Sequence, residues 1–225
     1  MQNIDLVRVA VAVLAGYLLG GIPFGIIVPR LIGGPDPRTI GSGRTGGANV
    51  SRAVGYRWAA VSGTLDVVKA AVAVLLVIAI GGGPVPQVLA ALAAVIGHSR
   101  SPYIGFHGGR GIAPAAGGAI VLAPIILVAI FPVFVLGIVL TRISSIGSLG
   151  ASLVGGIAMI AITAAAPLPP IYTTALPPIY FVYGVGVPGL IWVFHLDNIG
   201  RLLRGEERRV GRRAKAPDTG VTPTS

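Results

Sequence analysis

Long apolar stretches recur along this 225-residue chain, separated by short connections that are polar or rich in glycine and proline. A helix needs about 20 apolar residues to cross about 30 Å of hydrocarbon. The pattern predicts about seven transmembrane helices, at roughly residues 5–28, 56–80, 86–98, 111–124, 125–141, 146–165 and 178–196. The fourth and fifth are expected to be short and to turn near Pro124, although a re-entrant hairpin over residues 111–141 would fit equally well.

The composition supports an all-α integral membrane protein. Hydrophobic residues make up 54% of the chain and charged residues 11%, which is too little polar surface to cover a water-soluble globule. The first apolar stretch is longer than the apolar part of a secretory signal and is followed by many others, so we expect a retained helix. Cysteine is absent, which excludes disulfides and thiolate metal sites. We expect no metal and no cofactor.

Positive charges set the expected orientation. The first connection carries five arginines against Asp36, whereas residues 81–86 and 164–177 carry no charge. Because Lys and Arg favour cytoplasmic loops, the pattern predicts an N-terminus outside and a C-terminus in the cytoplasm. This topology places every polar, glycine-rich element on the cytoplasmic face, namely residues 38–57, 97–112, 141–148 and 195–206.

The domain organisation follows from the same pattern. Residues 1–207 are expected to form a single transmembrane domain, and residues 208–225 a basic cytoplasmic tail that is disordered by composition. Positive-inside topology alone accounts for most of the net charge of +10. A basic surface also attracts anionic lipid, by about 1 kcal/mol per Lys or Arg. Membrane lipids are therefore expected partners, and nucleic acid is not.

The stretch "TIGSGRTGGANVSR", residues 39–52, contains G-x-G-x-x-G at Gly41, Gly43 and Gly46. A dinucleotide site would require a preceding strand within a βαβ unit, and a Walker A loop would require a following Lys-Ser or Lys-Thr. Both readings fail on context. Glycines that let backbone N–H groups approach an anion, followed by a helix N-terminus, still favour a phosphate site.

A second glycine-rich element is "GHSRSPYIGFHGGRGIAP", residues 97–114. Gly108, Gly109 and Gly111 surround Arg110 just before an apolar helix, so the guanidinium and free N–H groups could face the same anion. Small-residue packing or a positive-inside anchor would also explain these residues. Two cationic glycine loops on one face predict either two phosphates or one phosphate held from two sides.

The third element places Ser144, Ser145 and Ser148 after Arg142, ahead of an apolar helix. Their hydroxyl groups are candidate donors, although a serine N-cap is the simpler interpretation.

In the fourth element, His195 and Asn198 lie three residues apart and share a helix face, although a histidine at a membrane boundary is often only an interfacial polar residue. Asp66 and Lys69, inside the second apolar stretch, are expected to form a structural ion pair. Ionisable residues within a span are also functional candidates by default.

Six elements in one order resemble the bacterial acyl-phosphate-dependent glycerol-3-phosphate acyltransferases, the PlsY type. They are "GGIPFG" (20–25), "GSGRTGGANVSRAVG" (41–55), "DVVK" (66–69), "GHSRSPYIGFHGGRGIAP" (97–114), "RISSIGS" (142–148) and "HLDNIGRLLRGEE" (195–207). The resemblance implies an enzyme of phospholipid biosynthesis in the bacterial plasma membrane, with its active site facing the cytoplasm. Such enzymes transfer a fatty acyl group from acyl phosphate to the sn-1 hydroxyl of glycerol 3-phosphate, giving lysophosphatidic acid and phosphate.

The resemblance also implies roles for individual residues. The family is thought to work without a dedicated protein base, the phosphate of the donor receiving the hydroxyl proton. The residues matching its catalytic positions are Ser42, Arg52, Arg110 and Ser145. Those matching its substrate-binding positions are Gly41, Gly43, Gly46, Asn49, Gly108, Gly109, Ser144, His195 and Asn198.

Several positions depart from the family pattern. Arg44 replaces the usual asparagine and Arg110 the usual lysine, and further departures are Gly47, Ala48, Ala70, His107 and Pro114. These changes leave open a paralogue with another acceptor or without activity. A transporter or flippase for an anionic lipid or phosphorylated metabolite is the alternative function. The absence of a convincing internal repeat, and polar motifs at one interface, favour the enzyme.

Overall fold

The computed structural model describes residues 5–165 and 176–210, and in these ranges the chain is built from helices and loops without a strand. Three short 3₁₀ turns, η1 (Pro37–Thr39), η2 (Pro102–Ile104) and η3 (Pro124–Ile126), lie in the connections. The α-helices are α1 (Leu6–Gly21), α2 (Phe24–Leu31), α3 (Gly47–Val54), α4 (Tyr56–Ala79), α5 (Pro84–Ser99), α6 (Ile112–Leu122), α7 (Leu127–Thr141), α8 (Ser144–Ala164), α9 (Tyr180–Phe194) and α10 (Leu196–Leu203).

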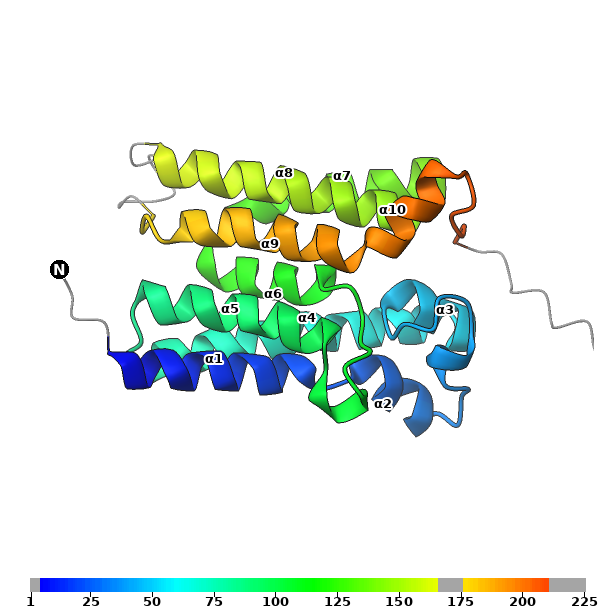
Figure 1. The fold of residues 1–225 in the computed structure, drawn as a ribbon, viewed down its shortest axis with the longest axis horizontal. Coiled ribbons are helices and arrows are strands. Elements are labelled where there is room, and N and C mark those ends of the chain that lie inside the picture. The colour runs from blue at the N-terminus through cyan, green and yellow to red at the C-terminus, as the bar shows by residue number, and fades with distance from the viewer. Residues whose placement is uncertain (1–4, 166–175, 211–225) are drawn as a thin grey trace, which may run out of the picture.

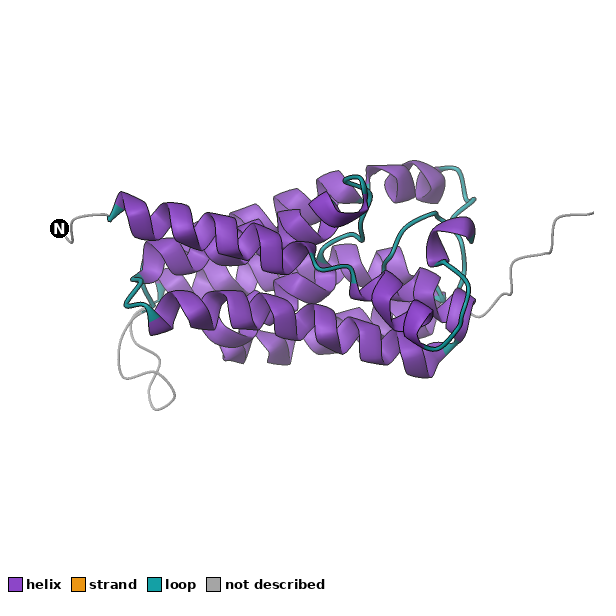
Figure 2. Ribbon diagram, turned by 90° about the horizontal axis from the view of Figure 1, so that it is seen from below, coloured by secondary structure: helices purple, strands orange, loops and turns teal. Residues whose placement is uncertain are grey.

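The longer helices form an elongated bundle along the long axis of the molecule (Figure 1). The short helices α2, α3 and α10 gather with the long polar connections at the end of the bundle remote from the N-terminus. The same separation is visible from a second direction (Figure 2). We call this end, made of residues 22–55, 99–111, 141–144 and 195–210, the loop end. The polar elements that the sequence predicted on one face are indeed together.

The predicted apolar segments each contain a helix, but the first is divided. Helix α1 ends at Gly21 and α2 begins at Phe24, because Pro23 has no N–H with which to continue the helical ladder. The carbonyl oxygen of Ile22, exposed by this break, accepts a hydrogen bond of 2.7 Å from Lys69 Nζ on α4. The break is therefore sealed by another helix.

Within residues 5–165 and 176–210, four helical stretches are long and apolar enough to cross a membrane, at Leu6–Leu31, Tyr56–Ala79, Pro124–Thr141 and Ser144–Ala164. Helices α6 and α7 are separate and are joined by η3, so the chain is interrupted at Pro124, as predicted. Helices α5, α6 and α9 have 16, 11 and 15 residues. Seven complete crossings and the orientation of the termini remain predictions.

Glycines let neighbouring helices approach at backbone distance. On α1, a Cβ added to Gly16 or Gly20 would overlap the backbone of Ala90 or Ala94 on α5. On α8, a Cβ added to Gly156 would lie 2.5 Å from the carbonyl oxygen of Gly184 on α9. Helix contacts through small residues are typical of membrane proteins, where van der Waals packing drives association.

The main hydrophobic core joins α4, α5, α6, α8 and α9, with Val95, Ala119, Met159 and Ile191 almost completely buried. Helix α7, in contrast, has no buried residue among its fifteen, and Phe131 and Leu140 are more than half exposed. In a bundle of this hydropathy, such apolar outer faces are suited to contact with lipid.

Candidate functional site

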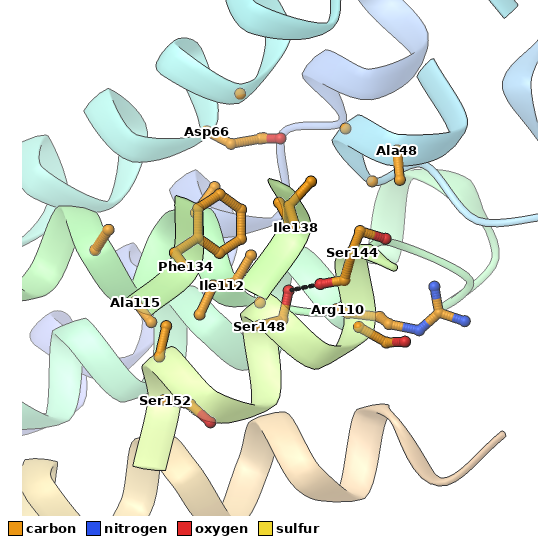
Figure 3. Close-up of a pocket in the computed structure, with 18 of the residues that line it drawn as sticks. Ala48, Asp66, Arg110, Ile112, Ala115, Phe134, Ile138, Ser144, Ser148 and Ser152 are labelled. Atoms are coloured by element: carbon orange, nitrogen blue, oxygen red, sulfur yellow. Dashed lines mark hydrogen bonds between the residues drawn. The ribbon is translucent and has the colours of Figure 1, made fainter. Parts of the chain in front are cut away.

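A cavity of about 730 Å³ begins at the loop end and extends between the long helices. Its loop-end part is lined by polar residues that include Arg110 and Ser144, and its deeper part by apolar residues such as Phe134, Ile138 and Ala115 (Figure 3). The cavity thus joins a cationic compartment to a hydrocarbon-like slot.

Three helices present their N-terminal residues to this cavity, α3 at Gly47, α6 at Ile112 and α8 at Ser144. The first backbone N–H groups of a helix have no partner within the helix, and its dipole makes this end positive. Their meeting in one cavity favours an anion as the ligand.

The first glycine-rich loop is held together by the side chain of Asn49, which is 1% exposed. Its Nδ2 lies 2.6 Å from Pro37 O, 2.8 Å from Ile40 O and 2.9 Å from Arg44 O. Its Oδ1 accepts from the backbone N–H of Ser42 at 3.3 Å. Asn49, predicted to bind substrate, therefore has its polar atoms committed to fixing the loop.

The glycines of this loop divide into two kinds. Gly41 and Gly43 have positive φ values of +55° and +68° and form a turn, and neither lines the cavity. Gly46 does line it, immediately before α3. Gly41 also leaves room for Asn49 Oδ1, which would lie 2.5 Å from an added Cβ.

Ser42 and Arg52, for which catalytic roles are predicted, both line the cavity. The guanidinium of Arg52 donates to Asn49 Oδ1 at 3.3 Å. Burial lowers its pKa, and the nearby charge of Arg208 acts in the same direction. An arginine nevertheless stays protonated at neutral pH, so Arg52 brings a positive charge to the cavity.

In the second glycine-rich loop, the structure contradicts the expectation of free N–H groups at Gly108 and Gly109. The N–H of Gly108 donates to Ser99 O, and that of Gly109 to His98 O, both at 3.1 Å. These glycines allow the loop to pack against the end of α5, since an added Cβ at Gly109 would overlap the ring of His98. They shape the site without lining it.

Arg110 itself reaches the cavity. Its Nη2 forms an ion pair of 2.8 Å with Asp197 Oδ2, while its Nε is buried without a hydrogen-bond partner. Burial lowers the pKa of Arg110, and the charge of Asp197 opposes that shift. Arg110 thus has an unused donor next to the cavity.

The serine element does not contain a serine N-cap. The N-cap of α8 is Ile143, whose N–H donates to Thr141 Oγ1 at 3.0 Å, so Ser144 and Ser145 belong to the first turn. Ser145 is 2% exposed, and its hydroxyl group is buried without a hydrogen-bond partner. Ser148 instead donates to Ser144 O at 3.0 Å (Figure 3). Ser145 therefore offers a buried, unused hydroxyl donor to the cavity, which Ser144 also lines.

His195 and Asn198 line the cavity together. His195 follows the last residue of α9, and its Nδ1 lies 2.8 Å from Ile191 O, so this nitrogen carries the proton and Nε2 keeps its lone pair. Burial lowers the pKa of His195 to about 4, which makes the ring neutral at pH 7. Asn198 donates to Glu207 Oε1 at 2.7 Å, and its Oδ1 has no partner.

Comparison with known proteins assigns most of the chain to one family. The family model described as glycerol-3-phosphate acyltransferase matches residues 10–205. The chain belongs to the glycerol-3-phosphate acyltransferase family. It is therefore an acyltransferase and a multi-pass integral membrane protein.

Individual relatives agree. A glycerol-3-phosphate acyltransferase of Synechococcus sp. (strain JA-3-3Ab) is 43% identical over 207 residues, covering 92% of this chain and 96% of the relative. One from Anaeromyxobacter dehalogenans (strain 2CP-1 / ATCC BAA-258) is 40% identical over 205 residues, covering 89% and 96%. The crystal structure of PlsY in its glycerol 3-phosphate form is similar with a TM-score of 0.79 at 29% identity, covering 90% of this chain and 96% of PlsY.

Three charged residues that support the site of this acyltransferase were not predicted from the sequence, namely Asp197, Arg201 and Glu207. Asp197 pairs with Arg110 and, at 3.3 Å, with Arg201. Glu207 accepts from Arg201 Nε at 2.9 Å and from Asn198. The signal was the close spacing of acids and arginines in "HLDNIGRLLRGEE", which a solvated surface helix would also show.

A buried cluster of Asp66, Lys69 and His98 packs against the second glycine-rich loop of the acyltransferase. Lys69 Nζ lies 2.6 Å from Asp66 Oδ1, which confirms the predicted pair, and 3.1 Å from His98 Nδ1. His98 was not predicted in this role. Since Lys69 also holds Ile22 O and Gly109 packs on His98, the cluster ties α1, α4, α5 and the loop before Arg110 together.

The Gly109→Ala variant of the acyltransferase tests this packing. The added Cβ would lie 2.8 Å from Cε1 of His98 and overlap its ring, so the loop or the histidine must shift. We expect a stability loss of about 1–3 kcal/mol and lower activity, measured by thermal unfolding and turnover in detergent. The control is Gly189→Ala on α9, where nothing lies within 4 Å. Equal behaviour of the two variants would contradict the packing role.

Proposed function

We propose that this acyltransferase moves a fatty acyl group from acyl phosphate to the sn-1 hydroxyl of glycerol 3-phosphate, releasing lysophosphatidic acid and phosphate. The observation that carries the proposal is one cavity that joins unpaired cationic and hydroxyl donors to an apolar slot. PlsY, at 28–29% identity, has been crystallised in a glycerol 3-phosphate form and a lysophosphatidic acid form, which supports the same acceptor and product here.

The charges around the cavity are linked to one another. Glu207 acts on both Arg52 and His195, and Arg110 acts on both His195 and Asp197. The positive charges of Arg52 and Arg110 are therefore linked through Glu207 and His195. A reaction between acyl phosphate and glycerol 3-phosphate requires two phosphates in this cavity.

The apolar slot suits the acyl chain. On α8 the lining runs from Ser144 to Gly156, about 18 Å at the helical rise, somewhat more than half of the roughly 30 Å hydrocarbon thickness. On its flanks are α4 and α7, which have little direct contact with each other. A chain could therefore enter sideways from the lipid, its phosphate remaining at the loop end.

The reaction requires no covalent intermediate with the protein. The glycerol hydroxyl oxygen attacks the acyl carbon, the bond from that carbon to the phosphate oxygen breaks, and the leaving phosphate takes the hydroxyl proton. Neutral His195 can accept a hydrogen bond at Nε2 from a glycerol hydroxyl and orient it. Ser145 and the first N–H groups of α8 can donate to the oxygen on which negative charge develops.

The proposed location is the bacterial plasma membrane, with the loop end in the cytoplasm. Four of the five arginines of the first connection lie at the loop end and the fifth, Arg57, is close to it, which agrees with the bias of basic residues toward the cytoplasmic side. The basic tail predicted over residues 208–225 would lie on the same side. All but residues 208–210 of it fall outside the described part of the chain.

The test is an assay of purified protein with palmitoyl phosphate and glycerol 3-phosphate. We expect equimolar release of phosphate and lysophosphatidic acid, measured by phosphate assay and mass spectrometry. Folded protein that yields no lysophosphatidic acid would overturn the proposal. Concentrative uptake of labelled glycerol 3-phosphate into proteoliposomes, without acyl transfer, would favour the transporter instead.

A single substitution tests the acyl slot. Ala119 on α6 is 1% exposed to solvent and lines the deep part of the cavity, so Ala119→Leu should shorten the slot. We expect the ratio of turnover with 12-carbon over 16-carbon acyl phosphate to rise roughly tenfold. The control is Ala161→Leu on the exposed face of α8, outside the cavity. An unchanged ratio in Ala119→Leu would show that the chain binds elsewhere.

A further inference from the structure

Arg44 is placed in the cavity by the clamp of the first glycine loop. Its carbonyl oxygen accepts from Asn49 Nδ2 at 2.9 Å, and this amide also holds Pro37 O and Ile40 O. The backbone of Arg44 is therefore fixed by a buried residue, although it lies in a loop. Its side chain lines the cavity, and Nη1 is buried from solvent without a hydrogen-bond partner.

The acids at the loop end are already committed to other arginines. Asp197 forms ion pairs with Arg110 and Arg201, and Glu207 with Arg201. Arg44 has no ion pair within the described ranges 5–165 and 176–210, although its charge acts on both Arg110 and Asp197. Positive charge is thus in excess on this side of the cavity.

A purely structural role does not account for this arrangement. A guanidinium that anchored the loop would have its donors on backbone carbonyls, and one that only solubilised it would extend into water. Arg44 Nη1 does neither. A buried donor without a partner is unfavourable, so a ligand that satisfies it would bind more tightly.

Arg110 offers a second unused donor of the same kind, because its Nε is also buried without a partner. Guanidinium groups bind phosphate through two parallel N–H donors. Two arginines with unused donors line one cavity, and the charge of one acts on the other. Together with the positive N-terminus of α6, they supply the charge that a phosphate group requires.

We propose that Arg44 is a phosphate-binding residue of this site, which holds one substrate phosphate together with Arg110. The inference rests on the proposed function for the identity of the substrates, acyl phosphate and glycerol 3-phosphate. The ligand chemistry, a phosphate monoester or acyl phosphate group, is the same for both. Kinetics with each substrate varied in turn identify which phosphate it holds.

The experiment compares Arg44→Gln and Arg44→Lys with the wild type. In Arg44→Gln we expect the KM of one substrate to rise about tenfold to a hundredfold, since a charge-assisted hydrogen bond is lost. Arg44→Lys keeps the charge without the planar fork, so its KM should lie between those of the wild type and Arg44→Gln. A purely structural residue would not be rescued in this graded way. Unchanged KM values for both substrates in folded Arg44→Gln would overturn the inference.

Arg57→Gln is the matched control. Arg57 is an exposed cation on α4, close to the loop end, stacked over Trp58 at 5.3 Å and outside the cavity lining. Its replacement should leave both KM values unchanged. If it raises them as much as Arg44→Gln does, general attraction of anions explains the effect and the inference is wrong.

Calorimetric binding of glycerol 3-phosphate and of inorganic phosphate separates this inference from the proposed function. If the wild type transfers no acyl group but binds these probes more tightly than Arg44→Gln does, the inference is retained and the acyltransfer reaction is rejected. Equal binding to both would reject the inference alone. A folded wild type that binds neither probe would reject the phosphate-binding role of Arg44.

Discussion

Replacement of Arg110 by glutamine is expected to lower kcat/KM by about 10²–10³-fold, the usual effect of losing one preorganised donor to developing charge. Arg110 brings a buried cation and an unpartnered Nε to the cavity. Its partner Asp197 is 39% exposed at the side chain and can be solvated when the pair is lost. The fold should therefore survive, which thermal unfolding checks beside initial rates of phosphate release.

Arg110→Lys is the informative companion to this variant. Lysine keeps the positive charge but presents a compact point donor in place of a planar fork. We expect it to retain most of the activity if charge alone is needed. If Arg110→Gln retains full activity, Arg110 does not contact the reacting groups, and the cationic compartment has to be assigned to Arg52 and Arg44.

Replacement of Lys69 by methionine is expected to cost about 3–5 kcal/mol of stability, as for other buried pairs that lose one partner. The side chains of Lys69 and Asp66 are 3% and 4% exposed, so the variant leaves a buried carboxylate beside His98 and an unsealed carbonyl at Ile22. The measurement is the free energy of unfolding in a detergent that supports the wild-type fold, or the melting temperature where unfolding is irreversible.

The double variant Asp66→Leu/Lys69→Met is the control for this prediction. It removes both charges together, and a buried pair replaced by apolar residues of similar size often costs little. We expect it to recover most of the stability lost in Lys69→Met, with the cost at Ile22 O remaining. A double variant no more stable than the single one would show that the Lys69 contact with Ile22, not the ion pair, carries the stability.

The helices were predictable because a run of apolar residues reports directly on burial in lipid or protein. The break in the first helix at Ile22 was not predictable, because the exposed carbonyl group of Ile22 is satisfied by Lys69, a residue 47 positions away. A short stretch of sequence around Pro23 shows the break in the helix, but not the distant Lys69 that satisfies the exposed carbonyl group. The predicted serine N-cap failed for a related reason, since Thr141 Oγ1 binds the N–H of Ile143 and Ile143 is the N-cap, so the helix begins one residue earlier than a serine cap would allow.

The candidate site was predictable to the level of motifs but not of roles. Arg52, Arg110, Ser145, His195 and Asn198 all line one cavity, and their roles in it remain predictions of the family resemblance. Individual donors depend on tertiary contacts that a motif does not contain. The N–H groups of Gly108 and Gly109, for example, are used by carbonyl oxygens at the end of α5.

The wall of the cavity is completed by the last described residues of the chain. Arg208 and Val210 still line it, beyond the domain boundary predicted at residue 207, and the N–H of Val210 donates to Arg142 O at 2.7 Å. During synthesis the apolar helices therefore reach the membrane before the site exists. A nonsense mutation just after α9 would leave a chain with all its apolar helices and no finished active site, so a protein detected by an N-terminal label need not be an active enzyme.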